Sequence, residues 1–320
     1  MRDLKSMKGT AVFLCLAVAL AFGAGRALDR EKYEEKFEKT EALAKDGKVF
    51  LINVSGDIEI KSWKEDQVKI DALKVSEASS LDKAKENANL VTIEVTKEAG
   101  VLRIETKYPE RRNFWGGSSI NVSVSYKLWI PEKAAVEVKS VSGDVNLASI
   151  GGAAKVDSVS GNVEILGAAG VEVKLVSGDL TLDNILGDAY LKSVSGNVTA
   201  TRVKGSLEIG SVSGDLDLKD VTDARTVSAK NVSGNITYVG SILPGGNYEI
   251  KSHSGDIKMR IPANSAFEFE ANTFSGVIDS DFQIEVVGKL SPREIHGTVN
   301  KGGARIRLAS FSGNIDLKKY

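Results

Sequence analysis

A Ser-Gly dipeptide recurs through this chain, and its recurrence limits the possible folds more than any other feature of the sequence. The ten copies begin at Ser55, Ser142, Ser160, Ser177, Ser195, Ser213, Ser233, Ser254, Ser275 and Ser312. The spacing is 17 or 18 residues from Ser142 to Ser213 and then lengthens to 20 or 21. A fixed period of this size is typical of a solenoid whose coils stack on their neighbours.

Apolar residues alternate with polar ones on both sides of each dipeptide. They lie three and five residues after the Ser, as in Val145 and Leu147, and six and four residues before it. A period of two places such side chains on one face of a strand, so each coil consists of two short strands with apolar faces directed inward. We expect the residue just before each Ser to point inward as well: Val in most coils and His253, Phe274 or Phe311 in the others.

The dipeptide itself predicts a tight corner, because glycine adopts positive φ readily and the Asp or Asn that follows it is a common turn residue. A weaker second corner is expected about ten residues later, at Gly152, Gly170, Gly187 and Gly205. The predicted fold class is therefore all-β. It is a single-stranded parallel β-helix in which the strands of successive coils lie roughly 4.8 Å apart.

The residue after the glycine alternates between Asp and Asn from coil to coil until Val277. Carboxylates stacked at roughly 5 Å would repel by about 3 kcal/mol at an effective dielectric constant near 20, and doubling their separation halves that energy. We therefore predict a structural turn ladder formed by Gly143, Asp144, Gly161, Asn162, Gly178, Asp179, Gly196, Asn197, Gly214, Asp215, Gly234 and Asn235. A calcium ladder is the alternative, but one carboxylate in every second coil supplies too few oxygens. We expect no bound metal.

The N-terminal segment 1–27 has the pattern of a secretory signal peptide, with three basic residues ahead of an apolar run at 11–22 and small residues after it. Cleavage after Ala27 fits this pattern, and Gly23 and Ala24 are other positions for it. An apolar run of this length is short for a membrane span. We expect export to the periplasm, the cell surface or the medium, and an uncleaved N-terminal anchor remains the alternative.

The only cysteine, Cys15, lies inside this segment. It follows the bulky Leu14, where a lipoprotein signal requires a small residue, so a lipid anchor is not expected. The mature chain would then contain no thiol and no disulfide, which is compatible with export because a large repeat core does not need cross-links.

The remaining chain divides into three parts. Residues 28–46 are a charged lead-in, either a short helix or an extended strand. Residues 47–133 hold the first coil and a β-rich capping insertion, in which Ser79 to Asp82 resembles a helix start leading into a short helix at 83–89. Residues 134–320 form the β-helix repeats with a closing C-terminal hairpin.

Three sequence features together resemble a bacterial family of proposed adhesins, which are domains of unknown function. They are the run from Val49 to Trp63, the strand from Leu102 to Thr106, and the stacked VSGD and VSGN units. The ending from Val287 to Asn314 fits the same family. The resemblance implies a right-handed β-helix at the cell envelope and brings no established catalytic residues.

The outward positions suggest where a partner could bind. On the strand before each Ser they interleave Glu with Lys, which is typical of a solvated face. The other outward face is flatter and less charged, and we predict it to be a surface for a glycan or an envelope protein, through Thr181, Thr199, Thr201 and Thr237. A second candidate combines arginine with aromatic residues in Arg111, Arg112, Phe114 and Trp115. These side chains suit sugar or protein binding, and a capping loop is the alternative.

Catalytic chemistry has little support in the sequence. We expect His253 to be buried and His296 to lie in a loop, and no histidine–carboxylate motif accompanies them. The near-zero net charge of −1 speaks against nucleic-acid binding. We therefore predict a non-enzymatic, adhesin-like or scaffold surface without a cofactor. The alternatives are a carbohydrate-active β-helix enzyme and an envelope-sensing module on an uncleaved anchor. The oligomeric state does not follow from the sequence.

Overall fold

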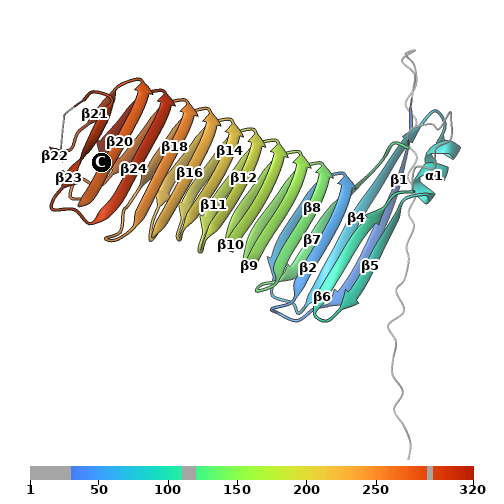
Figure 1. Ribbon diagram of the computed structural model, residues 1–320. Helices are drawn as coiled ribbons and strands as arrows, with labels where there is room; N and C mark the ends of the chain where they lie inside the picture. Colours follow the sequence, from blue (N-terminus) through green and yellow to red (C-terminus); the bar gives the residue numbers. More distant parts are fainter. Residues whose placement is uncertain (1–29, 110–119, 287–290) are drawn as a thin grey trace, which may run out of the picture.

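The computed structural model describes residues 30–109, 120–286 and 291–320. Within them the chain forms an elongated rod of stacked coils (Figure 1). Each coil contributes one strand to each of two parallel sheets, and successive coils pair in register. The single-stranded parallel β-helix predicted from the repeat is therefore confirmed.

Sheet 1 consists of the strands that precede the Ser-Gly corners, together with one strand from the N-terminal part of the chain. Neighbouring strands are parallel, and the corner serines stand opposite one another in successive coils. Its order along the rod is β6 (Val101–Lys107), β2 (Lys48–Ser55), β8 (Ala135–Ser142), the second halves of β9 (Val145–Ser160) and β10 (Val163–Ser177), β12 (Ala189–Ser195), β14 (Leu207–Ser213), β16 (Thr226–Ser233), β18 (Asn247–Ser254), β24 (Ala304–Ser312) and β20 (Phe267–Ser275).

Sheet 2 consists of the strands that follow the corners, again with one strand from the N-terminal part of the chain. Its order is β7 (Val122–Pro131), β3 (Ile58–Trp63), the first halves of β9 and β10, β11 (Leu180–Ile185), β13 (Val198–Val203), β15 (Leu216–Val221), β17 (Ile236–Gly240), β19 (Ile257–Ile261), β25 (Ile315–Lys319) and β21 (Ile278–Ser280).

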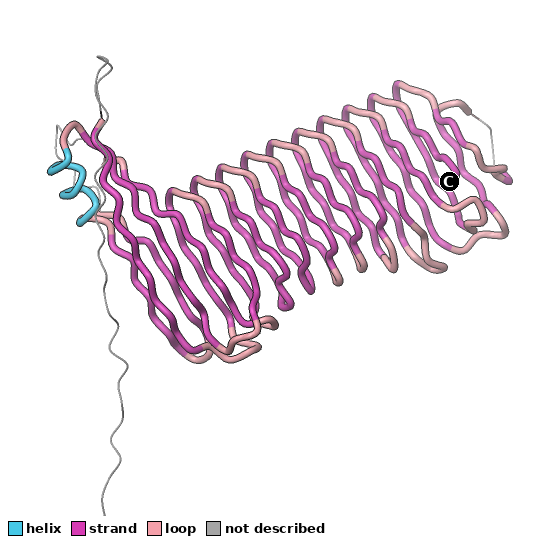
Figure 2. The backbone as a smooth tube through the Cα atoms, turned by 180° about the vertical axis from the view of Figure 1, so that it is seen from behind, coloured by secondary structure: helices cyan, strands magenta, loops and turns pink. Residues whose placement is uncertain are grey.

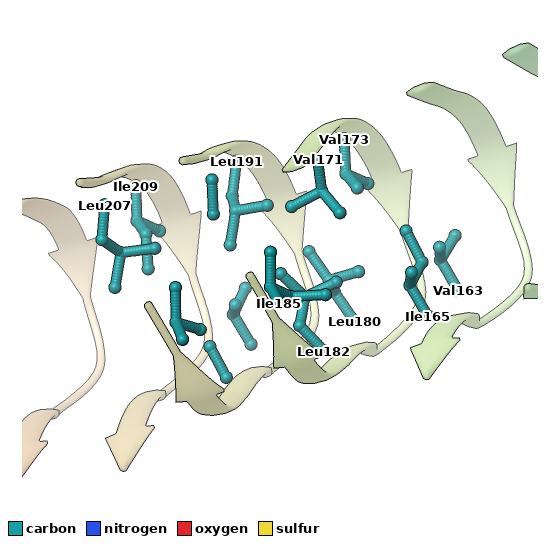
Figure 3. Packing of buried hydrophobic residues seen from close by; sticks show 14 of the residues in the cluster. Val163, Ile165, Val171, Val173, Leu180, Leu182, Ile185, Leu191, Leu207 and Ile209 are labelled. Atoms are coloured by element: carbon teal, nitrogen blue, oxygen red, sulfur yellow. The ribbon is translucent and has the colours of Figure 1, made fainter. Parts of the chain in front are cut away.

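The space between the sheets is one continuous apolar interior. Val163, Ile165, Leu180 and Leu182 from sheet 2 and the inward residues of sheet 1 point into it (Figure 3). The predicted internal file from Val145 to Leu216 is buried in every coil. Because fully burying one such side chain contributes about 1.5–3 kcal/mol, the repeated file is the main source of the rod's stability.

One prediction about the inward faces is wrong. The residue just before each corner Ser points outward, and the residue two before it points inward instead. In sheet 1 this inward place near the corner is held mostly by small polar residues, namely Asn53, Ser140, Ser158, Ser193, Ser211, Asn231, Ser252, Thr273 and Ser310. The alternation that places the sixth and fourth residues before Ser inward also places the second inward, so the first must face solvent.

The Ser-Gly corners carry the predicted turn ladder. The side-chain Oδ1 of each Asp or Asn accepts a hydrogen bond from the backbone N–H of its counterpart in the next coil. Asp144 accepts from Asn162 at 2.8 Å, for example, and Asn162 accepts from Asp179 at 3.0 Å. The side chains thus support the corner backbone of the neighbouring coil, in agreement with the structural interpretation of the ladder.

The alternation of Asp and Asn extends further than the sequence order suggested. In space the coil after Asp256 is that of Asn314, whose N–H donates to Asp256 at 2.7 Å. The coil of Val277 comes last, and its N–H donates to Asn314 at 3.1 Å. Val277 therefore stands at the end of the ladder, where no further coil requires an acceptor.

This ladder gives a pH-dependent prediction. Asn197→Asp places a third carboxylate between Asp179 and Asp215, and we expect it to lower the free energy of unfolding at pH 7 by about 1–2 kcal/mol after solvent screening. Repulsion raises the folded-state pKa of a carboxylate, so the loss is present above that pKa and disappears as the pH falls through it. Urea unfolding at pH 7 and pH 4 measures the difference. Asn247→Asp, paired in register with Arg305, is the control and should be neutral.

The predicted second bend is confirmed at two of the four glycines: Gly187 and Gly205 lie between strands, and Gly205 has φ of 130°. Gly152 and Gly170 lie inside the continuous strands β9 and β10. Seven residues after the Ser, inside the strands, the backbone has positive φ between 52° and 88°, at Ser149, Gly167, Asn184, Arg202 and Asp220. Gly, Asn and Asp tolerate this conformation, but Ser and Arg rarely adopt it, so the sequence does not predict it in every coil.

The N-terminal part caps one end of the rod. The charged lead-in is a strand and not a helix: β1 (Glu31–Ala42) pairs antiparallel with β4 (Gln67–Ala78), which pairs with β7. The predicted helix is α1 (Leu81–Asn89), capped by Ser80, whose Oγ accepts from the N–H of Lys83. β5 (Thr92–Glu98) pairs antiparallel with β6. The proposed signal segment lies outside the described residues.

The order of coils in space differs from their order in the chain at both ends. The coil of β2 and β3 lies between those of β6–β7 and β8–β9. Likewise the C-terminal coil of β24 and β25 lies between those of β18–β19 and β20–β21 (Figure 1). The hairpin of β22 (Glu285–Val286) and β23 (Glu294–Val299) covers β20.

Candidate functional site

An exposed apolar stripe runs along the corner edge of sheet 1. Its members are the outward residues just before each corner Ser: Val54, Val141, Val159, Val176, Val194, Val212, Val232, His253, Phe311 and Phe274. The valines are 38–49% exposed, which is unusual for a residue type that is normally buried. Figure 2 shows the regular row of corner loops beside which this stripe lies. Contiguous apolar surface of this kind marks interaction sites.

Three stacked aromatic side chains form the C-terminal end of the stripe. The ring of His253 stacks on Phe311 with centroids 5.0 Å apart, and Phe311 stacks on Phe274 at 4.8 Å. The expectation of a buried His253 is thus wrong, because the side chain shares the outward position of the valines. His296, on β23, is also exposed, and its Nε2 lies 3.1 Å from Glu294.

A column of lysines flanks the stripe on the sheet side. The column consists of the residues three positions before the corner Ser in seven successive coils, and five of these residues are lysines. We call it the lysine rail: Lys139, Asp157, Lys174, Lys192, Gly210, Lys230 and Lys251. Lys174 stands in register with Lys192, and Lys230 with Lys251, so like charges are direct neighbours. Such neighbours repel unless anionic groups lie close to them.

The lysine rail is only partly neutralised within the chain. Lys174 lies 3.0 Å from Glu172, and the hydrogen bond between them raises the lysine's pKa above its ordinary value and lowers that of the glutamate. Lys251 forms an ion pair with Glu249 at 2.6 Å. Within residues 30–109, 120–286 and 291–320, neither Lys139 nor Lys192 has a carboxylate within ion-pair distance.

On its other side the stripe borders the corner ladder, which we call the aspartate rail: Asp57, Asp144, Asn162, Asp179, Asn197, Asp215, Asn235 and Asp256. All of these side chains are exposed. Their Oδ1 atoms accept backbone hydrogen bonds, but no aspartate of the rail has a cationic partner among the described residues. The stripe therefore separates a positive rail from a negative one.

Between the stripe and the lysine rail runs a shallow groove. One section of about 530 Å³ spans the coils from Val54 to Val194, with the lysine stems as its opposite wall. A second section of about 420 Å³ lies between Lys230 and Phe274. Gly210 interrupts the lysine wall between the two.

The predicted threonine surface lies on sheet 2. Thr181 and Thr199 are paired neighbours, and Asp217 stands between Thr199 and Thr237 in the same column. Thr201 belongs to the next column, beside Asp183 and Lys219. The candidates thus share one outward face, but charged residues interrupt them. The other candidates, Arg111, Arg112, Phe114 and Trp115, lie outside the described residues.

Among the described residues, no group of three or more His, Cys, Asp or Glu side chains converges in an arrangement that could hold a metal ion. No helix in the same part of the chain has the length and apolar character needed to cross a membrane.

Comparison with known proteins places the chain in a family. No curated protein matches it. Among solved structures it is similar to a proposed cell adhesion protein of Clostridium sporogenes, at 12% identity over 89% of this chain and 100% of the other, with a TM-score of 0.23. A proposed adhesin of Bacteroides fragilis is 12% identical over 88% and 96% of the two chains, with a TM-score of 0.38.

A proposed lipid-binding protein of Parabacteroides distasonis is 10% identical over 89% and 96% of the two chains, with a TM-score of 0.34. All three TM-scores are too low to support an argument about detail. The Toastrack DUF4097 family model, in contrast, matches residues 48–241 and 243–318, which include every coil described above. The chain therefore belongs to the Toastrack DUF4097 family.

Proposed function

We propose that this protein is an exported, non-enzymatic β-helix that serves as an adhesin-like or scaffold surface at the cell envelope. The observation that carries the proposal is the outward surface of the rod. It holds an apolar stripe in regular register, bordered by charged rails, on a core that is complete without it. A surface of this kind has the composition of a binding face and not of a reaction centre.

The threonine surface on sheet 2 is the second part of the proposal. We assign it to a surface glycan or an envelope protein, because short hydroxyl side chains on a flat sheet provide hydrogen-bond donors and acceptors with little entropic cost. Exported rods that associate through one face would present several such surfaces together, which strengthens weak binding.

The binding experiment uses the full chain, secreted by an exporting host, mixed with envelope fragments of the source cells. We expect the protein to sediment with the fragments, and we expect Thr199→Lys/Thr237→Lys to reduce the bound fraction about tenfold. Thr92→Lys/Thr226→Lys, on exposed positions elsewhere, is the matched control and should bind as the wild type does. Equal binding by both variants would remove the threonine surface from the proposal.

Cell fractionation and turnover assays test the rest. The full chain should appear in the envelope or the medium, and it should leave polysaccharides intact. A cytoplasmic location, or release of sugar fragments that saturates with substrate, would overturn the proposed function.

A further inference from the structure

The stripe and its two rails form a surface that is complementary to itself. Across the edge of the rod the order is lysine rail, apolar stripe, aspartate rail, and the same order repeats in successive coils. Consider a second copy turned by 180° about an axis parallel to the rod. Its stripe then meets the first stripe, its lysine rail meets the first aspartate rail, and its aspartate rail meets the first lysine rail. The rods point in the same direction and their coils are level.

The charges agree with this arrangement coil by coil. In each coil, the rail residue three before Ser faces the corner residue two after Ser of the second copy. The facing pairs are Lys139 with Asp144, Asp157 with Asn162, Lys174 with Asp179, Lys192 with Asn197, Lys230 with Asn235, and Lys251 with Asp256. Asp157, the acidic residue of the lysine rail, thus faces an asparagine. No level coil in this set brings like charges together.

Other arrangements lose this agreement. A shift by one coil places Asp157 against Asp144 or Asp179 of the second copy. An antiparallel arrangement, with the axis across the rod, places lysine rail against lysine rail. Like charges facing each other at an interface cost several kcal/mol, so the parallel, level pairing is the one that the charges select.

The size of the surface also suits a second copy. The stripe contains ten residues, the aspartate rail eight and the lysine rail seven, and specific dimer interfaces involve roughly 20–30 residues on each side. A two-fold interface uses the same patch on both subunits, as the stripe requires. The central column is apolar and its borders are charged, which is the usual distribution between the core and the rim of an interface.

We propose that a second copy of this chain covers the apolar stripe, giving a parallel two-fold dimer with its coils level. The exposed valines pack against their own counterparts, and the lysines that lack a carboxylate within the chain, Lys139 and Lys192, approach the second copy's Asp144 and Asn197. The inference deepens the proposed association surface by naming its occupant. It leaves the threonine surfaces of both copies free.

Sedimentation velocity of the secreted full chain at micromolar concentration measures the oligomeric state. We expect a dimer for the wild type and a monomer for Val176→Glu/Val194→Glu, with unchanged circular dichroism because both positions face outward. Leu166→Glu/Tyr190→Glu is the matched control: it alters exposed apolar residues outside the stripe, and it should remain dimeric. A wild-type monomer at all concentrations, or a dimer that survives the stripe substitutions, would overturn the proposal.

Cysteine cross-linking in a Cys15→Ser background, which removes the only native thiol, tests the direction of the rods. In the parallel dimer Val141→Cys should form a disulfide with its own counterpart, and so should Val232→Cys. In an antiparallel dimer centred between Val176 and Val194 neither would react with itself, but a mixture of the two variants would cross-link. That second result contradicts the proposed geometry.

Vesicles containing anionic lipid test the main rival occupant. A monomeric wild type that binds such vesicles through the valines would show that lipid and not a second copy covers the stripe. If the protein is a monomer that binds the envelope, the proposed function holds and the proposed dimer is contradicted. If it neither dimerises nor binds the envelope, both proposals are contradicted.

Discussion

Replacing Gly196 with alanine is expected to lower the free energy of unfolding by roughly 3–5 kcal/mol. Gly196 has φ of 114°, a conformation that side-chain-bearing residues rarely adopt. A Cβ atom there would also lie 2.0 Å from the carbonyl oxygen of Gly178 in the neighbouring coil. That oxygen belongs to the backbone of the stacked corner and cannot move alone, so the two coils must separate there.

The measurement is thermal unfolding followed by circular dichroism, where we expect a decrease in melting temperature of roughly 10 °C. Gly210→Ala is the control. Gly210 lies in the strand β14 with nothing within 4 Å of its added Cβ, so this change should be neutral or slightly stabilising. Equal effects of the two substitutions would show that the close stacking of corner glycines does not limit the fold.

Deleting residues 304–320 is the second change with a large expected effect. In an ordinary solenoid the loss of a terminal repeat removes one interface. Here β24 pairs with β18 on one side and β20 on the other, and β25 pairs likewise with β19 and β21. The deletion therefore removes an internal layer, and we expect residues 262–303 to lose their ordered structure as well.

The coil of β20 is not expected to slide inward and replace the missing layer. Tyr248 on β18 now packs in register with Ile306, and sliding would set Phe267 and Phe269 against it. Overpacking of this kind costs about 1–3 kcal/mol. Hydrogen exchange measured by mass spectrometry should show residues 267–275 exchanging as an unfolded segment. Retained protection there would contradict the prediction, and deletion of residues 319–320 alone is the control and should change little.

Much of this fold is predictable because a period of two and a corner glycine act locally. The inward file from Val145 to Leu216, the helix after Ser80 and the turn ladder all follow from residues a few positions apart. The order of the coils could not be predicted, because Asn314 and Val277 carry equivalent corners and only long-range packing decides which one contacts Asp256.

The candidate site, like the fold, could be predicted from the sequence only in part. The valines of the stripe were read as core because an apolar residue beside a corner is normally buried, yet the alternation already placed them outside. The lysines of the lysine rail can be seen in the sequence, because they lie three positions before the corner Ser. Their place beside an apolar stripe depends on the stacking of coils, which the sequence alone does not show. The threonines were correctly placed outward, and their role stays a prediction.

The interleaved ends determine how such a rod can change its length over evolution. At the C-terminal end of the rod the outermost layer is made from an internal segment, the coil of β20 and β21, so sequence added after β25 has no open layer to continue. A duplicated coil between β9 and β16, in contrast, meets the same neighbours above and below that its parent meets. Family members whose rods differ in length are therefore expected to differ in the number of central coils, while both ends keep the same arrangement.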